Sequence, residues 1–253
     1  MPSIRQSLRD LAFRVAPATA ARLRRARRVK NAKRLRKSLE RAVTLDEKVD
    51  LALNSPFFPA QQKRAEILAL LQVLQEVKPT RICEIGTAAG GTLALLCQVA
   101  ASEARVLSID TGYRSEQIAA NTRLAMRGQQ VMCLAADSHA AETLDEVKSW
   151  LVGAKLDFLF IDGDHSFEGV SRDFALYRPL VRTDDGIIAF HDIVPDFKTR
   201  FGIVTSADVG EVPKFWSQLK TEVEASEFIE DPEQDGMGIG LVRLSTVWDP
   251  RGS

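Results

Sequence analysis

The chain has 253 residues, of which 45% are hydrophobic and 27% are charged, and its formal net charge at pH 7 is zero. These values are ordinary for a soluble globular protein, and the length allows one domain with a full core plus an appendage. No apolar run is long enough to span a bilayer, and the N-terminus lacks the apolar segment of a secretory signal.

The zero net charge conceals two oppositely charged parts. Residues 1–41 contain fourteen Lys or Arg and two acids, Asp10 and Glu40, which gives a net charge of +12. Residues 42–253 contain twenty Lys or Arg and thirty-two acids, which gives −12. We therefore predict a basic N-terminal helical arm over residues 1–41 and a single domain over residues 42–253.

The arm consists of two segments that favour helix. Apolar residues recur at helical spacing over residues 4–15, and this helix is expected to end before Pro17. Residues 18–41 are rich in the helix formers Ala, Arg, Lys and Leu. The simplest interpretation is a solvated arm, and the alternative is a peripheral contact with anionic lipid at the inner face of the membrane. A transit peptide fits less well because the arm is not Ser-rich, and no nucleic acid is expected because aromatic residues are few.

Downstream of the arm, apolar strands alternate with helices. After a connector (residues 42–60) and a helix (61–77), strands are predicted over residues 81–85, 105–110, 131–135, 156–161 and 186–190. The intervening helices are predicted over residues 91–101, 115–127, 140–151 and 167–180. Continuously apolar strands in this rhythm predict a doubly wound, Rossmann-like α/β fold with a mostly parallel sheet. A loop (194–212), a helix from residue 213 and two final strands (221–229 and 238–244) predict an antiparallel edge.

The cysteines give information about the compartment. Cys83, Cys97 and Cys133 lie inside apolar stretches, and none belongs to a C-x-x-C pair. An odd number with this spacing fits neither a disulfide framework nor a zinc site. We expect three buried thiols in a reducing cytoplasm.

The first strand of the alternating region leads into a glycine-rich turn, E84-I-G-T-A-A-G-G91. Gly86 allows a sharp turn, and Gly90 or Gly91 lets a ligand approach the backbone at a helix N-terminus. The spacing matches neither the dinucleotide G-x-G-x-x-G nor the Walker motif, and no Lys follows, so a nucleoside triphosphate is not expected. A glycine turn that serves only packing is also common.

Polar residues also end the next strands. Asp110 ends the second strand and can accept hydrogen bonds from ribose hydroxyls. Asp137 and Ser138 follow the third strand, where side chains can border an adenine, although Ser138 could equally cap a helix. Because the carboxyl ends of parallel strands meet at one edge, the series predicts a single ligand site.

The fourth and fifth strands end in groups suited to chemistry. Asp162, Asp164 and His165 follow the fourth strand, and His191 and Asp192 end the fifth. A His with an ordinary pKa near 6.5 could remove a hydroxyl proton near neutral pH without special tuning. The alternative is that Asp164 and His165 only cap the following helix. The remaining histidine, His139, is expected on the surface.

These segments together carry a family resemblance. The glycine turn, the segment I161-D-G-D-H-S-F-E-G-V170 and the strand I187-I-A-F-H-D192 resemble class I S-adenosylmethionine-dependent methyltransferases. The branch resembled is the cephalosporin-hydroxylase-like or small-molecule O-methyltransferase branch, related to catechol and caffeoyl-CoA O-methyltransferases. The resemblance covers roughly residues 60–245. It implies a seven-stranded sheet with a late antiparallel strand, and methyl transfer to a hydroxyl of a small molecule or sugar.

The resemblance also implies roles for individual residues. S-adenosylmethionine would be bound by residues of the turn and of the strand ends: Glu84, Gly86, Thr87, Gly90, Gly91, Asp110, Asp137, Ser138 and Asp162. In metal-dependent members, Asp162, His191 and Asp192 match ligand positions for a divalent ion. Mg²⁺ prefers oxygen ligands, so a His at position 191 leaves Mn²⁺, Fe²⁺, Zn²⁺ or no metal open as well. His165 matches the position of the catalytic base.

Two other functions fit the pattern less well. An NAD-dependent oxidoreductase on a similar fold lacks support, because the G-x-G-x-x-G fingerprint and a Tyr-x-x-x-Lys pair are missing. A non-catalytic cofactor-binding module would be expected to lose the polar groups after the fourth and fifth strands, and this chain keeps them. The acceptor stays open, and so does a homo-oligomer formed through the N-terminal segment.

Overall fold

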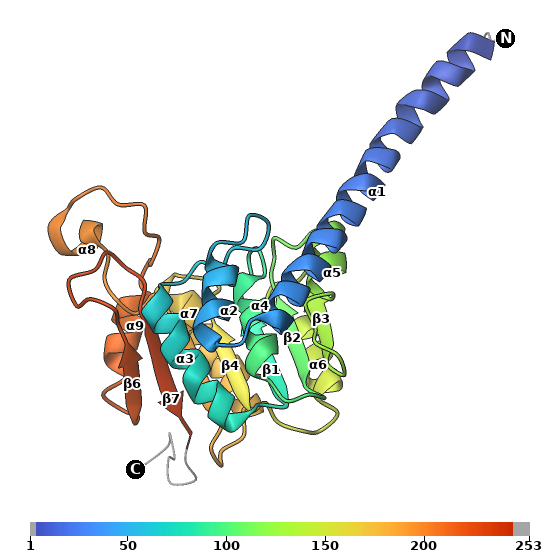
Figure 1. The fold of residues 1–253 in the computed structure, drawn as a ribbon. Helices are drawn as coiled ribbons and strands as arrows, with labels where there is room; N and C mark the ends of the chain where they lie inside the picture. Colours follow the sequence, from blue (N-terminus) through green and yellow to red (C-terminus); the bar gives the residue numbers. More distant parts are fainter. Residues whose placement is uncertain (1–3, 245–253) are drawn as a thin grey trace.

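The computed structural model describes the backbone of residues 4–244 and the side chains of residues 19–244. Within these residues, seven strands form one sheet in the order β3-β2-β1-β4-β5-β7-β6 (Figure 1). The strands are β1 (Arg81–Ile85), β2 (Arg105–Ile109), β3 (Gln130–Leu134), β4 (Phe158–Ile161), β5 (Ile187–His191), β6 (Ala225–Phe228) and β7 (Ile239–Arg243). β1 to β5 pair in parallel, and β7 is antiparallel to both β5 and β6. The predicted mostly parallel sheet with a late antiparallel strand is confirmed.

Helices cover both faces of the sheet. One face packs against α1 (Ile4–Arg41), α2 (Leu45–Leu53), α3 (Arg64–Val77), α4 (Gly91–Val99) and α5 (Ser115–Asn121). The other face packs against α6 (Ala141–Leu151), α7 (Phe167–Tyr177), the 3-10 turn η1 (Arg178–Leu180) and α9 (Val212–Leu219). Successive strand residues point to opposite faces, so Phe160 joins the first core cluster and Ile161 the second. This two-sided burial explains why the strands are apolar at every position.

Two short helices lie in segments that were expected to be loops. α2 begins at a capping box: the Thr44 hydroxyl accepts a hydrogen bond from the Glu47 N–H, and the Glu47 carboxylate accepts one from the Thr44 N–H. The sequence T44-L-D-E47 is the signature of this motif, so α2 was predictable. α8 (Phe197–Phe201) starts at the capping side chain of Asp196 and ends at Gly202, which has a φ of 69°.

α1 differs from the prediction in two ways. It is one continuous helix, so the expected end before Pro17 is wrong; proline removes one backbone hydrogen bond, and the Ala-rich flanks favour helix strongly enough to continue. In addition, Leu35 and Leu39 are buried in the same core cluster as the strands. The last part of the predicted arm therefore belongs to the packed body, whereas the N-terminal part of α1 extends well beyond it (Figure 1).

Two further expectations can be compared with the fold. Cys83, Cys97 and Cys133 are free and buried, as predicted. Among the helices that the structure describes, none combines the length and apolar character that crossing a membrane requires. The parallel strands all end at one edge of the sheet, and the loops that follow them bring the predicted site residues together.

Candidate active site

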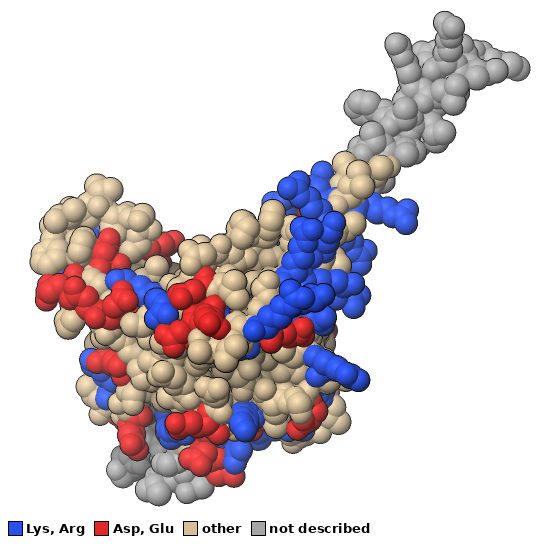
Figure 2. All heavy atoms as spheres, in the orientation of Figure 1, with Lys and Arg blue, Asp and Glu red and all other residues tan. Residues whose placement is uncertain are grey.

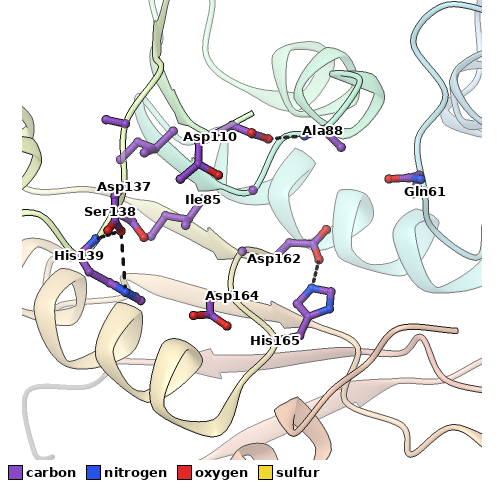
Figure 3. Close-up of a pocket in the computed structure, with 15 residues that line it drawn as sticks. Gln61, Ile85, Ala88, Asp110, Asp137, Ser138, His139, Asp162, Asp164 and His165 are labelled. Carbon is purple, nitrogen blue, oxygen red and sulfur yellow. Dashed lines mark hydrogen bonds and ion pairs between the residues drawn. The ribbon is translucent and has the colours of Figure 1, made fainter. Parts of the chain in front are cut away.

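A cavity of about 560 Å³ lies outside the carboxyl ends of β1 to β4. Its volume exceeds those of four other cavities, which range from about 250 to about 430 Å³. Residues that follow each of these strands line it (Figure 3): Ile85, Gly86, Ala88, Asp110, Asp137, Ser138, His139, Asp162, Asp164 and His165. A cavity therefore lies at the edge of the sheet where the single ligand site is predicted.

Gly86 forms the floor between β1 and β4. Its φ is 82°, in the left-handed region that favours glycine, and a Cβ there would lie 1.8 Å from the Asp162 carbonyl oxygen. The backbone of the turn therefore rests directly on the backbone of the Asp162 segment. No other residue type fits this position without moving one of the two strands.

Gly90 and Gly91 do not line the cavity. A Cβ on Gly90 would meet the Asn121 side chain at 2.7 Å, and one on Gly91 would meet the Ala60 nitrogen at 2.2 Å. Both glycines let α4 pack closely against neighbouring segments. For these two positions the structure supports the packing interpretation of the glycine turn over direct cofactor contact.

Glu84 and Thr87 lie behind the cavity wall. Both are buried, and the Thr87 hydroxyl donates a 2.6 Å hydrogen bond to Glu84 Oε2. Glu84 Oε1 has no hydrogen-bond partner among the described residues. Burial raises the pKa of Glu84 to about 8, against the opposing effect of the Thr87 hydrogen bond. The Glu84 carboxyl group is therefore held neutral over much of the physiological range.

Asp110 lines the cavity and also holds the glycine turn. Its Oδ2 accepts hydrogen bonds from the backbone N–H groups of Thr87 (3.0 Å) and Ala88 (2.8 Å), and its Oδ1 accepts one from Gly112 (2.7 Å). Each carboxylate oxygen has further lone-pair capacity, so these contacts leave room for a ribose hydroxyl. Backbone donors fix the position of this carboxylate before any ligand binds.

The residues after β3 form a second wall. Asp137 accepts a 2.8 Å hydrogen bond from the His139 N–H, and Ser138 is buried. The expectation that His139 lies on the surface is wrong: its ring Nε2 lies 3.1 Å from Oδ1 of the fully buried Asp173. Sequence patterns could not reveal this pair, because Asp173 lies within α7, far along the chain.

Four side chains at the ends of β4 and β5 form a cluster, which we call the quartet: Asp162, His165, His191 and Asp192. His191 Nδ1 lies 3.1 Å from Asp162 Oδ1 and 3.3 Å from Asp192 Oδ2. His165 Nε2 lies 3.6 Å from each of the same two carboxylate oxygens. Four of the five residues predicted at the two strand ends thus converge on one point, and Asp164 is the exception.

The charges of the quartet are strongly coupled. The Asp162 hydrogen bond, assisted by the charge of Asp192, raises the pKa of His165 to about 9 in spite of partial burial. Burial alone would lower the pKa of His191, but the two carboxylates outweigh it and raise that pKa to about 10. His165 therefore carries a proton at neutral pH in this arrangement, which corrects the premise that it has an ordinary pKa.

Backbone contacts hold His165 in place, and Asp192 has an unusual backbone conformation. The His165 ring Nδ1 contacts the Asp208 carbonyl oxygen, and the His165 carbonyl accepts a 2.7 Å hydrogen bond from the Glu211 N–H. Asp192 has a φ of 62°, which is uncommon for a residue with a side chain and is concentrated at functional sites. Asp164 is different: its Oδ1 accepts a 2.9 Å hydrogen bond from the Ser166 N–H at the start of α7.

Two glutamines were missed by the sequence analysis. Gln61 lines the cavity, and Gln62, which is 8% exposed, donates a 3.4 Å hydrogen bond to Asp162 Oδ2. They lie just before α3, at the start of the segment predicted to be a helix, about a hundred residues ahead of Asp162 in the chain. No motif marks them, so only the fold could reveal this contact.

The charge of the cavity tests which cofactor fits. Four carboxylates line it (Asp110, Asp137, Asp162 and Asp164), and no Lys or Arg is found among its described lining residues. A pyrophosphate group would be repelled there, whereas a nucleoside that carries a positively charged sulfonium and no phosphate would be attracted. The residues present therefore fit S-adenosylmethionine and do not fit NAD.

Comparison with known proteins gives the same assignment. Residues 83–193 match a family described as "Methyltransferase domain". A search among curated proteins finds no significant match.

Two solved structures share the fold. An O-methyltransferase from Bacillus cereus in complex with SAH is 17% identical, with 80% of this chain and 91% of that chain covered and a TM-score of 0.55. The O-methyltransferase TomG from Streptomyces achromogenes, involved in tomaymycin synthesis and in complex with SAM, is 18% identical, with coverages of 81% and 91% and a TM-score of 0.54. The predicted methyltransferase is confirmed: the chain contains a methyltransferase domain, and that domain has the class I fold of these two structures.

Proposed function

We propose that the protein is an S-adenosylmethionine-dependent O-methyltransferase that acts on a hydroxyl of a small molecule or sugar. The observation that carries this proposal is the position of two quartet members, Asp162 and His165, at one end of a cavity that is lined by four carboxylates and has no Lys or Arg among its described lining residues. The cavity suits the cofactor, and the quartet suits the activation of a hydroxyl beside it. The two similar structures, which are O-methyltransferases with SAH or SAM bound, support the same chemistry.

The cofactor would supply a methyl group activated by a positively charged sulfur. Asp110 would accept hydrogen bonds from the ribose, Asp137 and Ser138 would border the adenine, and the Gly86 backbone would allow close approach near Asp162. The carboxylates of the cavity would favour the sulfonium through their negative charge. Gly90, Gly91, Glu84 and Thr87 would act by shaping the turn, since they do not line the cavity.

The quartet is suited to hold a divalent ion. Asp162, His165 and Asp192 each offer one ligand atom, and these three atoms lie within 4.8 Å of one another. His191 Nδ1 contacts both carboxylates. Two carboxylates with the His191 imidazole as the third ligand would favour Mn²⁺, Fe²⁺ or Zn²⁺ over Mg²⁺, which prefers oxygen ligands, and would leave the Nε2 lone pair of His165 free. An ion there would lower the pKa of an acceptor hydroxyl.

His165 is the candidate base, and it would have to lose its proton first. Its ring faces Asp162 and Asp192, whose negative charges favour the protonated form. When another positive charge engages these carboxylates, their effect on the His165 pKa falls and the imidazole can accept the proton of a hydroxyl. Asp208 and Glu211 hold the residue in place through backbone contacts.

The two alternatives explain less of the site. An NAD-dependent oxidoreductase would place a pyrophosphate among four carboxylates. A non-catalytic cofactor-binding module would not account for the quartet. The three buried cysteines are not paired with one another, which fits the cytoplasmic location that we propose.

Calorimetric titration with S-adenosylhomocysteine, in the presence and absence of Mn²⁺, tests the proposal, with NAD as a control. We expect micromolar binding of S-adenosylhomocysteine and no binding of NAD. Substitution of Asp110 by Ala should weaken S-adenosylhomocysteine binding at least tenfold, because it removes a ribose acceptor and loosens the turn. If NAD binds and S-adenosylhomocysteine does not, the proposed function is wrong.

A further inference from the structure

α1 is fixed to the body by one face of its C-terminal half. Asn31, Ala32, Leu35 and Leu39 on this face are buried, and Arg36 donates a 3.2 Å hydrogen bond to the Ala125 carbonyl after α5. The Leu39 carbonyl accepts a 2.7 Å hydrogen bond from Lys48 of α2. The opposite face of this half of the helix is therefore held rigidly outward.

The outward face carries a row of positive charges. Five of these cations and one leucine recur at intervals of three or four residues, which places them on one side of the helix: Leu23, Arg27, Lys30, Arg34, Lys37 and Arg41. We call the exposed cations of this side the cationic face of α1: Arg22, Arg27, Lys30, Lys33, Arg34, Lys37 and Arg41. In Figure 2, Lys and Arg gather along α1, whereas Asp and Glu are spread over the body.

No salt bridge joins a cation of this face to a described residue. One salt bridge lies along the described part of α1, between Arg36, which is not part of the cationic face, and Glu40 at 3.5 Å. Several of the cations are spaced four residues apart, such as Lys30 and Arg34 or Lys33 and Lys37, and like charges at this spacing repel each other. The face therefore costs the isolated protein stability, and an anionic partner would remove that cost.

Apolar groups accompany the cations. Leu23, on the same side of the helix, is 66% exposed, and Phe57 is 44% exposed with the Arg27 guanidinium 5.9 Å from its ring centroid. A mixture of Lys, Arg and exposed aliphatic and aromatic groups on a helix is typical of contact with a bilayer interface. The helix has 38 residues and is about 57 Å long, so a flat surface can engage many of its cations at once.

We infer that the cationic face of α1 docks the protein on an anionic membrane surface. Anionic lipid headgroups supply the charge that the face lacks, and Leu23 and Phe57 supply apolar contact with the interface. The contact is peripheral and electrostatic, so it weakens as salt screens the charges. Nucleic acid fits the face less well, because Phe57 is the one exposed aromatic side chain beside it among the described residues.

Vesicle co-sedimentation of the full chain tests the inference, with phosphatidylcholine vesicles with and without 30% phosphatidylserine at about 0.1 M salt. We expect binding to the anionic vesicles alone, and loss of binding at about 0.5 M salt. The variant K30E/K33E/K37E should bind at least about 100-fold more weakly. Glu is a good helix former, so α1 should stay intact, which circular dichroism can check.

A matched variant separates this face from overall charge. Lys148 of α6, Lys155 ahead of β4 and Arg243 of β7 are exposed cations outside α1, and K148E/K155E/R243E changes the net charge by the same amount. This variant should bind anionic vesicles within about threefold of the unaltered protein. Equal loss of binding in both variants would overturn the assignment to α1.

A label on the helix tests direct contact. Because Cys83, Cys97 and Cys133 are buried, a single new thiol at Ala26 or at Ser149 can be labelled selectively with an environment-sensitive fluorophore. The label at Ala26 should brighten on anionic vesicles, and the label at Ser149 should not. Three results would overturn the inference: equal binding to neutral vesicles, binding of duplex DNA or RNA in place of vesicles, and a salt-sensitive self-association that removes vesicle binding.

Discussion

The two ends of the cavity are built in different ways. At the end formed by β1, β2 and β3, backbone groups fix the key side chain: three N–H groups hold Asp110, and the Gly86 turn rests on a neighbouring strand. At the end formed by β4, beside the carboxyl end of β5, side chains hold one another, and both histidines depend on the same two carboxylates. The first end is set by the fold, whereas the second consists of titratable side chains for which we propose a metal site.

From this difference we expect the first end to bind the cofactor and the second end to carry out proton transfer. The donors that hold Asp110 at the first end are backbone amide groups, which do not titrate. A cluster of two acids and two histidines changes charge with its surroundings, which suits groups that must pass a proton. The following predictions test this division, in order of decreasing expected effect.

Gly86→Ala should have the largest effect, because the added methyl group would disrupt the backbone contact at the first end. A Cβ there would lie 1.8 Å from the Asp162 carbonyl oxygen, and φ is 82°, so we expect a loss of more than about 3 kcal/mol in unfolding free energy. Urea unfolding measures this. Gly153→Ala is the matched control, since its φ is 79° but nothing lies within 4 Å, and it should lose only about 1 kcal/mol. Equal losses would show that the close contact is unimportant.

Asp162→Asn should break the second end and spare the first. It removes the charge that faces His165 and His191, so Mn²⁺ binding should weaken at least about 100-fold, as measured by electron paramagnetic resonance. Asp164→Asn makes the same chemical change two residues away, in a carboxylate that accepts a hydrogen bond from the Ser166 N–H, and should change Mn²⁺ affinity less than about threefold. A similar loss in both variants would argue against a defined metal site.

Glu84→Gln tests the buried carboxyl group beneath the first end. The pKa of Glu84 is about 8 in the folded protein, above its ordinary value in the unfolded chain, so the folded state keeps the proton longer. The unaltered protein should therefore lose stability as pH rises from about 5 to about 8, by at most roughly 1.4 kcal/mol per pH unit, with no further loss from this group above that.

In Glu84→Gln this contribution to the pH dependence should disappear. The difference in unfolding free energy between the two proteins, measured at several pH values in the absence of ligand, isolates it from the titration of the histidines. A difference that does not change with pH would mean that Glu84 is ionised in the folded protein.

Gln62→Ala should have the smallest effect. Gln62 donates a hydrogen bond to Asp162 Oδ2, and such supporting contacts orient a metal ligand, so we expect Mn²⁺ affinity to fall about tenfold with little change in S-adenosylhomocysteine binding. Gln61→Ala is the control, because Gln61 lines the cavity without a hydrogen bond to Asp162. It should change Mn²⁺ affinity less than about twofold.

The sequence predicted the sheet and most of the site because both follow from local patterns. Apolar strands that end in Gly, Asp or His identify the carboxyl edge, and parallel pairing then brings Asp110, Asp162 and Asp192 to one place. Contacts between distant segments were not predictable: the Gln62 hydrogen bond, the His139–Asp173 pair and the burial of Gly91 against Ala60 each need the folded chain. The pKa of His165 depends on the same convergence, so its residue type alone suggested the wrong value.

The contact between Gly86 and the Asp162 carbonyl has a consequence for how the two ligands influence each other. A cofactor that moves the turn after β1 must also move the backbone that carries Asp162, because no space separates them. Occupancy of the two ends is therefore expected to be thermodynamically linked. By reciprocity, whatever factor the nucleoside imposes on metal affinity, the metal must impose on nucleoside affinity.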